Sequence, residues 1–222
     1  MQQYNNSISF EIGGEYALFS DPITRVGGEK CSYQIPTYDA IRGIIESIYW
    51  KPTLIWVVDK VRVINQIKSE AKGVRTLSYT KDTGERAGLA YYTYLKQVKY
   101  QVNAHFEWNK SRPDLIADRN ENKHQEITLR KLAEGGKRDI FLGTRECQAY
   151  VKAVDFGLGE GYYDNSGTLP FGLMYHGIVY PDKTQSDKMV VNFFDAKMVN
   201  GVITYPRPSE CTSSKVINKG AK

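Results

Sequence analysis

Side chains alternate between apolar and polar over a long stretch of this chain, from Tyr92 to Trp108. One parity is apolar or aromatic except at Lys96, and the other parity is mainly polar. Successive side chains of a strand point to opposite faces of a sheet, so the pattern predicts a strand with one face in the core. Because the stretch exceeds the usual strand length, we expect a hairpin or one long, bent strand. Tyrosines of this kind can also stack on RNA bases, but their shared parity with valines favours the core.

Upstream of this stretch, the sequence predicts a strand, a helix and a second strand. Residues 8–19 alternate loosely and end at a Ser-Asp-Pro turn. Thr37 is suited to cap a helix over 38–50, in which isoleucines recur at helical spacing before Pro52 ends it. Residues 54–58 form an apolar, β-branched run typical of a buried strand. Residues 69–88 are charged and glycine-rich without periodicity, and we expect a long surface loop there.

Downstream, the pattern predicts a helix over 124–134, stopped by two glycines, and a strand over 146–156. Three short β-like stretches follow within 171–205, separated by Pro181-Asp182 and Asn200-Gly201. The order of elements matches the split βαβ arrangement. We therefore expect an α+β fold with three parts: a ferredoxin-like (RRM-like) domain over 7–160, a small antiparallel β-sheet subdomain over 161–206, and a disordered polar tail over 207–222.

The composition limits where the protein works and what it binds. With 222 residues and 41% hydrophobic content, the chain can form a proper core. It contains no apolar run long enough to span a membrane, and its first residues do not resemble a signal peptide, so we expect a cytoplasmic protein with reduced cysteines. The net charge of +5 is compatible with a polyanionic partner. Many proteins of this charge bind no nucleic acid, so charge alone decides little.

Motifs for metal and nucleotide chemistry are missing from the sequence. The three histidines, His105, His124 and His176, have no zinc-binding spacing, and no GxSxG, Walker or dinucleotide-binding motif is present. What remains is the Lys123-His124 pair at the predicted start of a helix. Metal-free RNA cleavage uses the neighbouring 2′-hydroxyl as nucleophile and needs a base, an acid and a cation, which lysine and histidine can supply. The helix dipole would also help to keep such a histidine neutral. The alternative is an exposed pair on a solvated loop.

Tyr49 is a second candidate for chemistry. On a helical wheel, it falls at the edge of the buried isoleucine stripe, and Arg42 falls beside it. A tyrosine at such an edge buries its ring and keeps its hydroxyl available. The alternative is a tyrosine that only closes the boundary of the core.

Six stretches of the sequence resemble the fifth CRISPR-associated protein family, specifically its d variant from type I-C systems, a branch of the RAMP superfamily. Together they cover most of residues 14–208. The stretches are GEYALFSDPITRVGGEKCSYQIPTYDAIRGIIESIYWKP, KGVR at Lys72, YYTYLKQVKYQVNAHFEWN, RPDLIADRNENKH, GGKRDIFLGTREC and ITYPRP.

The resemblance implies a metal-independent endoribonuclease without a cofactor. Members of this variant recognise a repeat hairpin in precursor CRISPR RNA and cut at its 3′ base, leaving 2′,3′-cyclic phosphate and 5′-hydroxyl ends. The family's catalytic tyrosine lies in an IYW motif, here Tyr49, and its lysine and histidine lie in a KH pair, here Lys123 and His124. We assign the main proton-transfer role to His124 and stabilisation of the phosphorane charge to Lys123. Tyr49 has either a second proton-transfer role or the role of orienting the 2′-hydroxyl. The division between acid and base stays open.

The resemblance also implies a glycine-rich loop after the second helix, here residues 135–138, whose amides and basic side chains suit phosphates. Basic residues that we expect to contact RNA are Arg25, Lys30, Arg42, Arg119, Lys137 and Arg138.

After cleavage, we expect the protein to stay on the 5′ handle of the mature crRNA, together with the backbone and large subunits of the type I-C surveillance complex. One alternative is a non-catalytic subunit that only binds the handle, although such a subunit would not need Tyr49, Lys123 and His124 together. A weaker alternative is a metal-dependent DNA nuclease, for which no ligand cluster is evident.

Overall fold

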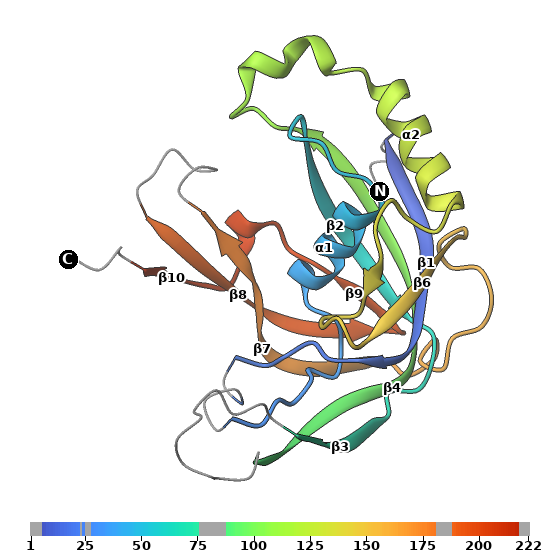
Figure 1. Ribbon diagram of the computed structural model, residues 1–222, viewed down its shortest axis with the longest axis vertical. Coiled ribbons are helices and arrows are strands. Elements are labelled where there is room, and N and C mark those ends of the chain that lie inside the picture. Colours follow the sequence, from blue (N-terminus) through green and yellow to red (C-terminus); the bar gives the residue numbers. More distant parts are fainter. Residues whose placement is uncertain (1–5, 23, 25–27, 76–87, 181–187, 218–222) are drawn as a thin grey trace.

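A computed structural model describes residues 6–22, 24, 28–75, 88–180 and 188–217 of the chain. Within these residues, ten strands join into one antiparallel sheet with the path β10-β8-β9-β2-β4-β1-β6-β5, while β3 pairs with β4 and β7 pairs with β8. The fold is thus a mixed α/β structure with a large antiparallel sheet and few helices (Figure 1). Its elements are β1 (Ser7–Ala17), α1 (Tyr38–Ile48), β2 (Leu54–Val63), β3 (Ser69–Arg75), β4 (Leu89–Trp108), the 3-10 helix η2 (Pro113–Asp118), α2 (Glu121–Ala133), β5 (Ile140–Phe141), β6 (Gln148–Ala153), β7 (Thr168–Val179), β8 (Met189–Val199), β9 (Val202–Thr204), the 3-10 helix η3 (Pro208–Glu210) and β10 (Ser213–Ile217).

The alternating stretch is one long, bent strand, β4, as one of the two interpretations predicted. Its first part pairs with β3, and through Thr93 also with Cys31, and its second part lies between β1 and β2 (Figure 1). The bend coincides with Gln97, whose φ of 52° departs from strand geometry, directly after the lysine that interrupts the apolar parity. The prediction of a surface loop over 69–88 is wrong for Ser69–Arg75, because cross-strand pairing with β4 orders these residues despite their weak pattern. Residues 76–87 lie outside the described part.

Both α-helices cover one face of the sheet. α1 contacts β2, β5, β7 and α2, and α2 contacts β1 and β6. The isoleucines of α1 and the apolar parity of β4 belong to the same buried cluster. Thr37 caps α1 by accepting a hydrogen bond from the Ala40 amide, as predicted, but α1 ends at Ile48 and leaves Tyr49 in an extended conformation. α2 begins three residues before the predicted start, at Glu121.

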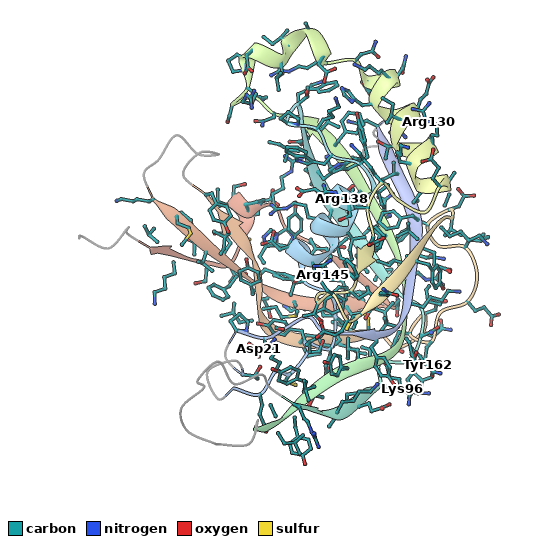
Figure 2. The ribbon with its side chains drawn as sticks, in the orientation of Figure 1. Asp21, Lys96, Arg130, Arg138, Arg145 and Tyr162 are labelled. Atoms are coloured by element: carbon teal, nitrogen blue, oxygen red, sulfur yellow. The ribbon has the colours of Figure 1, made fainter. Side chains whose placement is uncertain are left out.

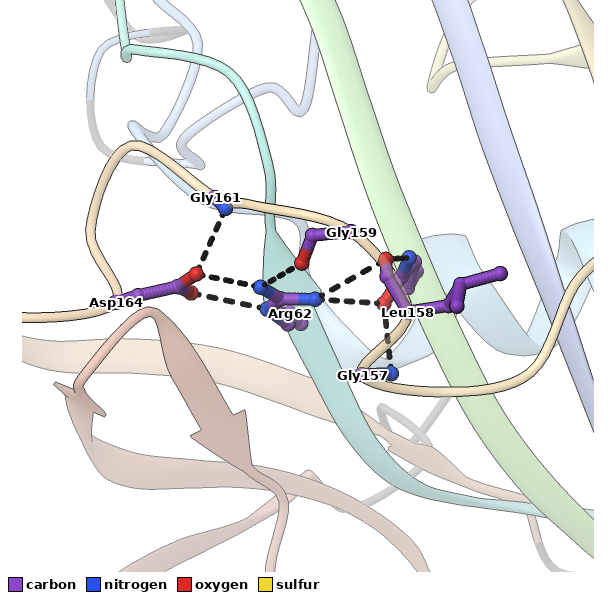
Figure 3. Close-up of polar contacts among 7 residues, drawn as sticks. Arg62, Gly157, Leu158, Gly159, Gly161 and Asp164 are labelled. Atoms are coloured by element: carbon purple, nitrogen blue, oxygen red, sulfur yellow. Dashed lines mark hydrogen bonds and ion pairs between the residues drawn. The ribbon is translucent and has the colours of Figure 1, made fainter.

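The opposite face of the sheet is covered in part by the loop that follows β6. Arg62 of β2 is buried and holds this loop through a bidentate ion pair with Asp164, at 3.0 and 2.6 Å, and through the carbonyl oxygen of Gly159 (Figure 3). Gln101 of β4 bonds to Leu158 and Gly157 of the same loop. Some polar positions of β4 are therefore buried, which the simple two-faced pattern did not predict.

The C-terminal strands are hydrogen-bonded to the rest of the sheet through β9, which pairs with β2. The predicted Asn200-Gly201 turn connects β8 and β9, with both residues at positive φ. Pro181-Asp182 lies outside the described residues. The prediction of a disordered tail is wrong for η3 and for β10, because β10 pairs with β8 along five residues.

The cysteines and the helix lengths bear on two further expectations. All three cysteines are unpaired thiols, as the sequence predicted. Among the residues described, no helix has the length and apolar character needed to span a bilayer.

Candidate active site

The first turn of α2 places Lys123 and His124 in opposite environments. Asn120 caps this helix, and its side-chain oxygen accepts a hydrogen bond from the Lys123 amide at 3.0 Å. Adjacent helical residues project about 100° apart. His124 therefore points into the core and is fully buried, whereas the Lys123 side chain remains 49% exposed. The alternative of an exposed pair on a solvated loop is wrong, because only the lysine meets solvent.

His124 forms a buried, hydrogen-bonded pair with Tyr49. The imidazole Nδ1 lies 2.9 Å from the Tyr49 hydroxyl oxygen. Tyr49 directly follows α1 and is only 4% exposed. Phe106 and Trp108, near the end of β4, approach the imidazole ring at steep angles, with centroids 6.2 and 5.8 Å away. The end of α1, the end of β4 and the start of α2 thus meet at this pair.

The second ring nitrogen determines the tautomer of His124. Nε2 lies 2.9 Å from the backbone carbonyl oxygen of Asp118. A carbonyl oxygen can only accept a hydrogen bond, so Nε2 carries the proton. In the neutral imidazole Nδ1 is then an acceptor, and the Tyr49 hydroxyl donates to it. A proton can therefore pass from the Tyr49 oxygen to His124 without any change in their arrangement.

The Asp118 carboxylate links the lysine to this pair. Its Oδ1 lies 2.6 Å from Lys123 Nζ, and its Oδ2 accepts a hydrogen bond from the Thr53 hydroxyl at 2.8 Å and lies 3.5 Å from His124 Nε2. Hydrogen bonds from Lys123 and Thr53 lower the pKa of Asp118 to about 2. Burial, and then the Asp118 charge, raise the pKa of Tyr49. At neutral pH the site therefore holds a carboxylate anion and a protonated tyrosine hydroxyl.

These groups form a proton-transfer pair beside an exposed cation, which is the set that attack by an RNA 2′-hydroxyl requires. In the part of the chain that the structure describes, no group of three or more His, Cys, Asp or Glu side chains is placed to hold a metal ion.

Comparison with known proteins identifies the family. Residues 7–206 match the family described as Cas_Cas5d: CRISPR-associated protein (Cas_Cas5). The chain belongs to this family. The match confirms the resemblance that the six stretches carry.

Three similar proteins illustrate the match. A protein from Mannheimia succiniciproducens named CRISPR pre-crRNA endoribonuclease Cas5d is 30% identical over 230 residues, which cover 90% of this chain and 95% of that protein. A protein of the same name from Thermus thermophilus is 29% identical over 165 residues, which cover 69% of this chain and 67% of that protein. A solved structure described as a crystal structure of a CRISPR-associated protein superposes with a TM-score of 0.80 at 35% identity, covering 97% of this chain and 100% of that one.

The helical wheel predicted that Arg42 lies beside Tyr49 on one helix. This prediction is wrong, because α1 ends at Ile48 and Tyr49 is extended. The Arg42 guanidinium is 2.6 Å from the carboxylate of Asp39 and 3.7 Å from that of Glu46. Asp39 in turn accepts a hydrogen bond from Tyr175 of β7. Two carboxylates therefore already balance the charge of Arg42, which would have to leave them to contact a phosphate.

In the glycine-rich loop, residues 135–138, the backbone amides bond to the ends of both α-helices. The amides of Gly135 and Gly136 donate to carbonyls in the last turn of α2, and the amides of Lys137 and Arg138 donate to the Ser47 carbonyl at the end of α1. The prediction that these amides bind phosphates is wrong, because they satisfy the carbonyls that both helices leave open. The Lys137 and Arg138 side chains are exposed, and Arg138 lies beside α1 (Figure 2), where its guanidinium donates to the Glu46 carbonyl at 3.3 Å.

The other predicted RNA contacts are spread over the molecule. Arg119 follows η2, where its guanidinium donates to the Asn109 carbonyl at 2.9 Å and so tightens the segment between β4 and α2. Lys30 lies 4.9 Å above the Tyr92 ring, near the far end of β4 from Trp108. Arg25 lies outside the described residues. The structure therefore brings together Tyr49, Lys123 and His124, with Arg119 next to Asp118, whereas Lys30 lies toward the other end of β4.

Asp118 and Thr53 were not predicted as part of the site. Asp118 lies five residues before Lys123 in a polar segment, and that carboxylate-to-lysine spacing was the available signal. Thr53 gave no signal, because its hydroxyl is buried at the start of β2 and meets Asp118 only in the folded chain.

Proposed function

We propose that this Cas5d protein is a metal-independent endoribonuclease that recognises the repeat hairpin of precursor crRNA and cuts at its 3′ base. The observation that carries the proposal is the buried hydrogen bond between Tyr49 and His124, with the exposed Lys123 ammonium beside it. Relatives named as pre-crRNA endoribonucleases support the same substrate.

In the proposed reaction, the RNA supplies its own nucleophile. The 2′-hydroxyl attacks the adjacent phosphorus while its proton passes to the Tyr49 oxygen and the Tyr49 proton passes to His124 Nδ1. Lys123 balances the charge of the phosphorane and protonates the departing 5′-oxygen. The products are a 2′,3′-cyclic phosphate and a 5′-hydroxyl. Tyr49 is 4% exposed and His124 is fully buried, so we now place the Tyr49 oxygen between the RNA and His124, which changes the emphasis of the sequence-based assignment.

The arrangement of strands and helices also supports a role in binding the RNA hairpin. The strand order β2-β4-β1-β6, with α1 after β1 and α2 after β4, is the arrangement expected of a ferredoxin-like domain. We assign contacts with the hairpin phosphates to the exposed side chains of Lys137 and Arg138. After cleavage, the protein would remain on the 5′ handle with the other subunits of a type I-C surveillance complex.

The test is cleavage of a CRISPR repeat hairpin in excess EDTA by the wild-type protein and by His124→Ala. We expect wild type to cut and the variant to bind without cutting. His176→Ala is the matched control, because His176 is also a buried histidine but bonds to the Pro206 carbonyl and stacks on Tyr38, away from the site.

Replacement of the 2′-hydroxyl at the cut site by hydrogen should abolish cutting and spare binding. Cutting of this deoxy substrate would show that water is the nucleophile. Wild-type cutting that is lost in EDTA and restored by a divalent metal would contradict the mechanism, and binding without any cutting would favour the non-catalytic subunit.

A further inference from the structure

We propose that Asp118 is a positioning residue of the active site, which orients the Lys123 ammonium and fixes the proton on His124 without touching RNA. This inference rests on the proposed function. It follows from two groups of one residue: the carboxylate meets Lys123 Nζ at 2.6 Å, and the backbone carbonyl oxygen meets His124 Nε2 at 2.9 Å.

Asp118 is also held from the side of the sheet, independently of its bonds to α2. The Thr53 hydroxyl, at the start of β2, donates to its carboxylate at 2.8 Å, and Thr53 is only 1% exposed. The Thr53 carbonyl accepts the amide of Asn109, just beyond β4, at 2.8 Å. The Asn109 side chain in turn donates to the Pro52 carbonyl at 3.0 Å. Asp118 therefore links the start of β2 and the end of β4 to a lysine on a neighbouring helix.

Lys123 needs such a partner. A lysine ammonium sits on a flexible four-carbon stem, and this one is about half exposed, so its position is otherwise free. An ammonium has three N–H donors, and the bond to Asp118 uses one, which leaves two for the oxygens of a phosphate. The low pKa of Asp118 agrees with this geometry, because the carboxylate remains charged throughout the neutral range.

Asp118→Asn removes the charge at nearly constant shape and leaves the backbone carbonyl in place. We expect the single-turnover cleavage rate at saturating protein to fall about 10- to 100-fold, the effect of losing one hydrogen bond to a charged group. Hairpin affinity should stay within about threefold, because Asp118 does not contact RNA. Asp114→Asn is the matched control: Asp114 lies in the same 3-10 helix and pairs with Arg112 at 2.7 Å, with its side chain 56% exposed. It should cut at the wild-type rate.

A double-mutant cycle separates positioning from folding. If the carboxylate acts through Lys123, Asp118→Asn should slow a Lys123→Ala protein by less than about threefold. Equal rates of Asp118→Asn and wild type would overturn the inference. So would a rate loss that multiplies fully with that of Lys123→Ala, since Asp118 would then serve the fold alone. A wild-type protein that fails to cut the hairpin in EDTA would instead refute the proposed function, whatever the variants do.

Discussion

The hydrogen bond between Tyr49 and His124 predicts two separate consequences for Tyr49→Phe. The substitution keeps the ring and removes the hydroxyl, so His124 Nδ1 loses its buried donor at 2.9 Å. Leaving a buried acceptor without a partner costs about 1–3 kcal/mol. For a chain of this size, 1 kcal/mol shifts the melting temperature by about 2–4 °C. Tyr49→Phe should therefore melt about 2–12 °C below wild type.

The consequence for activity should be larger than the consequence for stability. If the Tyr49 oxygen relays the 2′-hydroxyl proton to His124, its removal takes away a general acid–base step worth about 10²- to 10⁴-fold in rate. The assay is single-turnover cleavage of the repeat hairpin in EDTA, at a temperature well below the melting transition of the variant. Hairpin affinity, measured on the 2′-deoxy substrate, should change little.

Tyr205→Phe is the matched control for this experiment. Tyr205 is also a buried tyrosine, and its hydroxyl donates to the Pro36 carbonyl at 2.6 Å, away from His124. We expect a similar loss of melting temperature and a wild-type rate. Tyr49→Phe that cuts within about threefold of wild type would refute the relay, since acid–base catalysis contributes at least about 10²-fold. Tyr49 would then be a tyrosine that closes the core boundary.

Three further predictions follow from other parts of the structure. The pKa of Asp118 is lowered from 3.8 to about 2, so its contribution to stability is present above about pH 4 and is lost as the pH falls toward 2. In a pH series, the difference in melting temperature between wild type and Asp118→Asn should therefore shrink between about pH 4 and pH 2. Arg62→Met should lower the free energy of unfolding in urea by about 1–3 kcal/mol, because it leaves the Gly159 carbonyl and the Asp164 carboxylate without their donor. A loss below about 0.5 kcal/mol would contradict the importance of this network. The double variant Lys137→Ala, Arg138→Ala should bind the hairpin more weakly and cut at the wild-type rate at saturating protein. The slope of log affinity against log salt concentration should fall by about one for each phosphate that the protein no longer neutralises.

How far the sequence predicts the fold depends on how strong each local pattern is. The alternation in β4 and the isoleucine spacing in α1 are strong, and both elements form where expected. β3 and β10 have weak patterns of their own and were predicted as loop and tail. Both are edge strands that form because a neighbouring strand offers its backbone for pairing. Such strands depend on tertiary context more than on their own residues.

The active site also has residues that the sequence predicted and features that it did not. Resemblance to the family pointed to Tyr49, Lys123 and His124, and the structure brings these three together. Neither motif nor spacing revealed that His124 is buried, because a histidine in a polar segment looks exposed in the sequence. The role of Asp118 was hidden for another reason: half of it comes from a backbone carbonyl, which every residue has.

The position of the site follows from where secondary structure ends. The last carbonyls and first amides of a helix lack partners within it, and buried polar groups must find partners elsewhere. The Tyr49 carbonyl, just beyond α1, accepts a hydrogen bond from the Trp56 indole at 2.8 Å, and the Asp118 carbonyl, at the end of η2, meets His124. These backbone groups fix the tyrosine and the histidine from opposite sides. The proton-transfer pair is therefore held by bonds that the ends of α1 and η2 would need in any case, so its geometry adds little to the demands of folding.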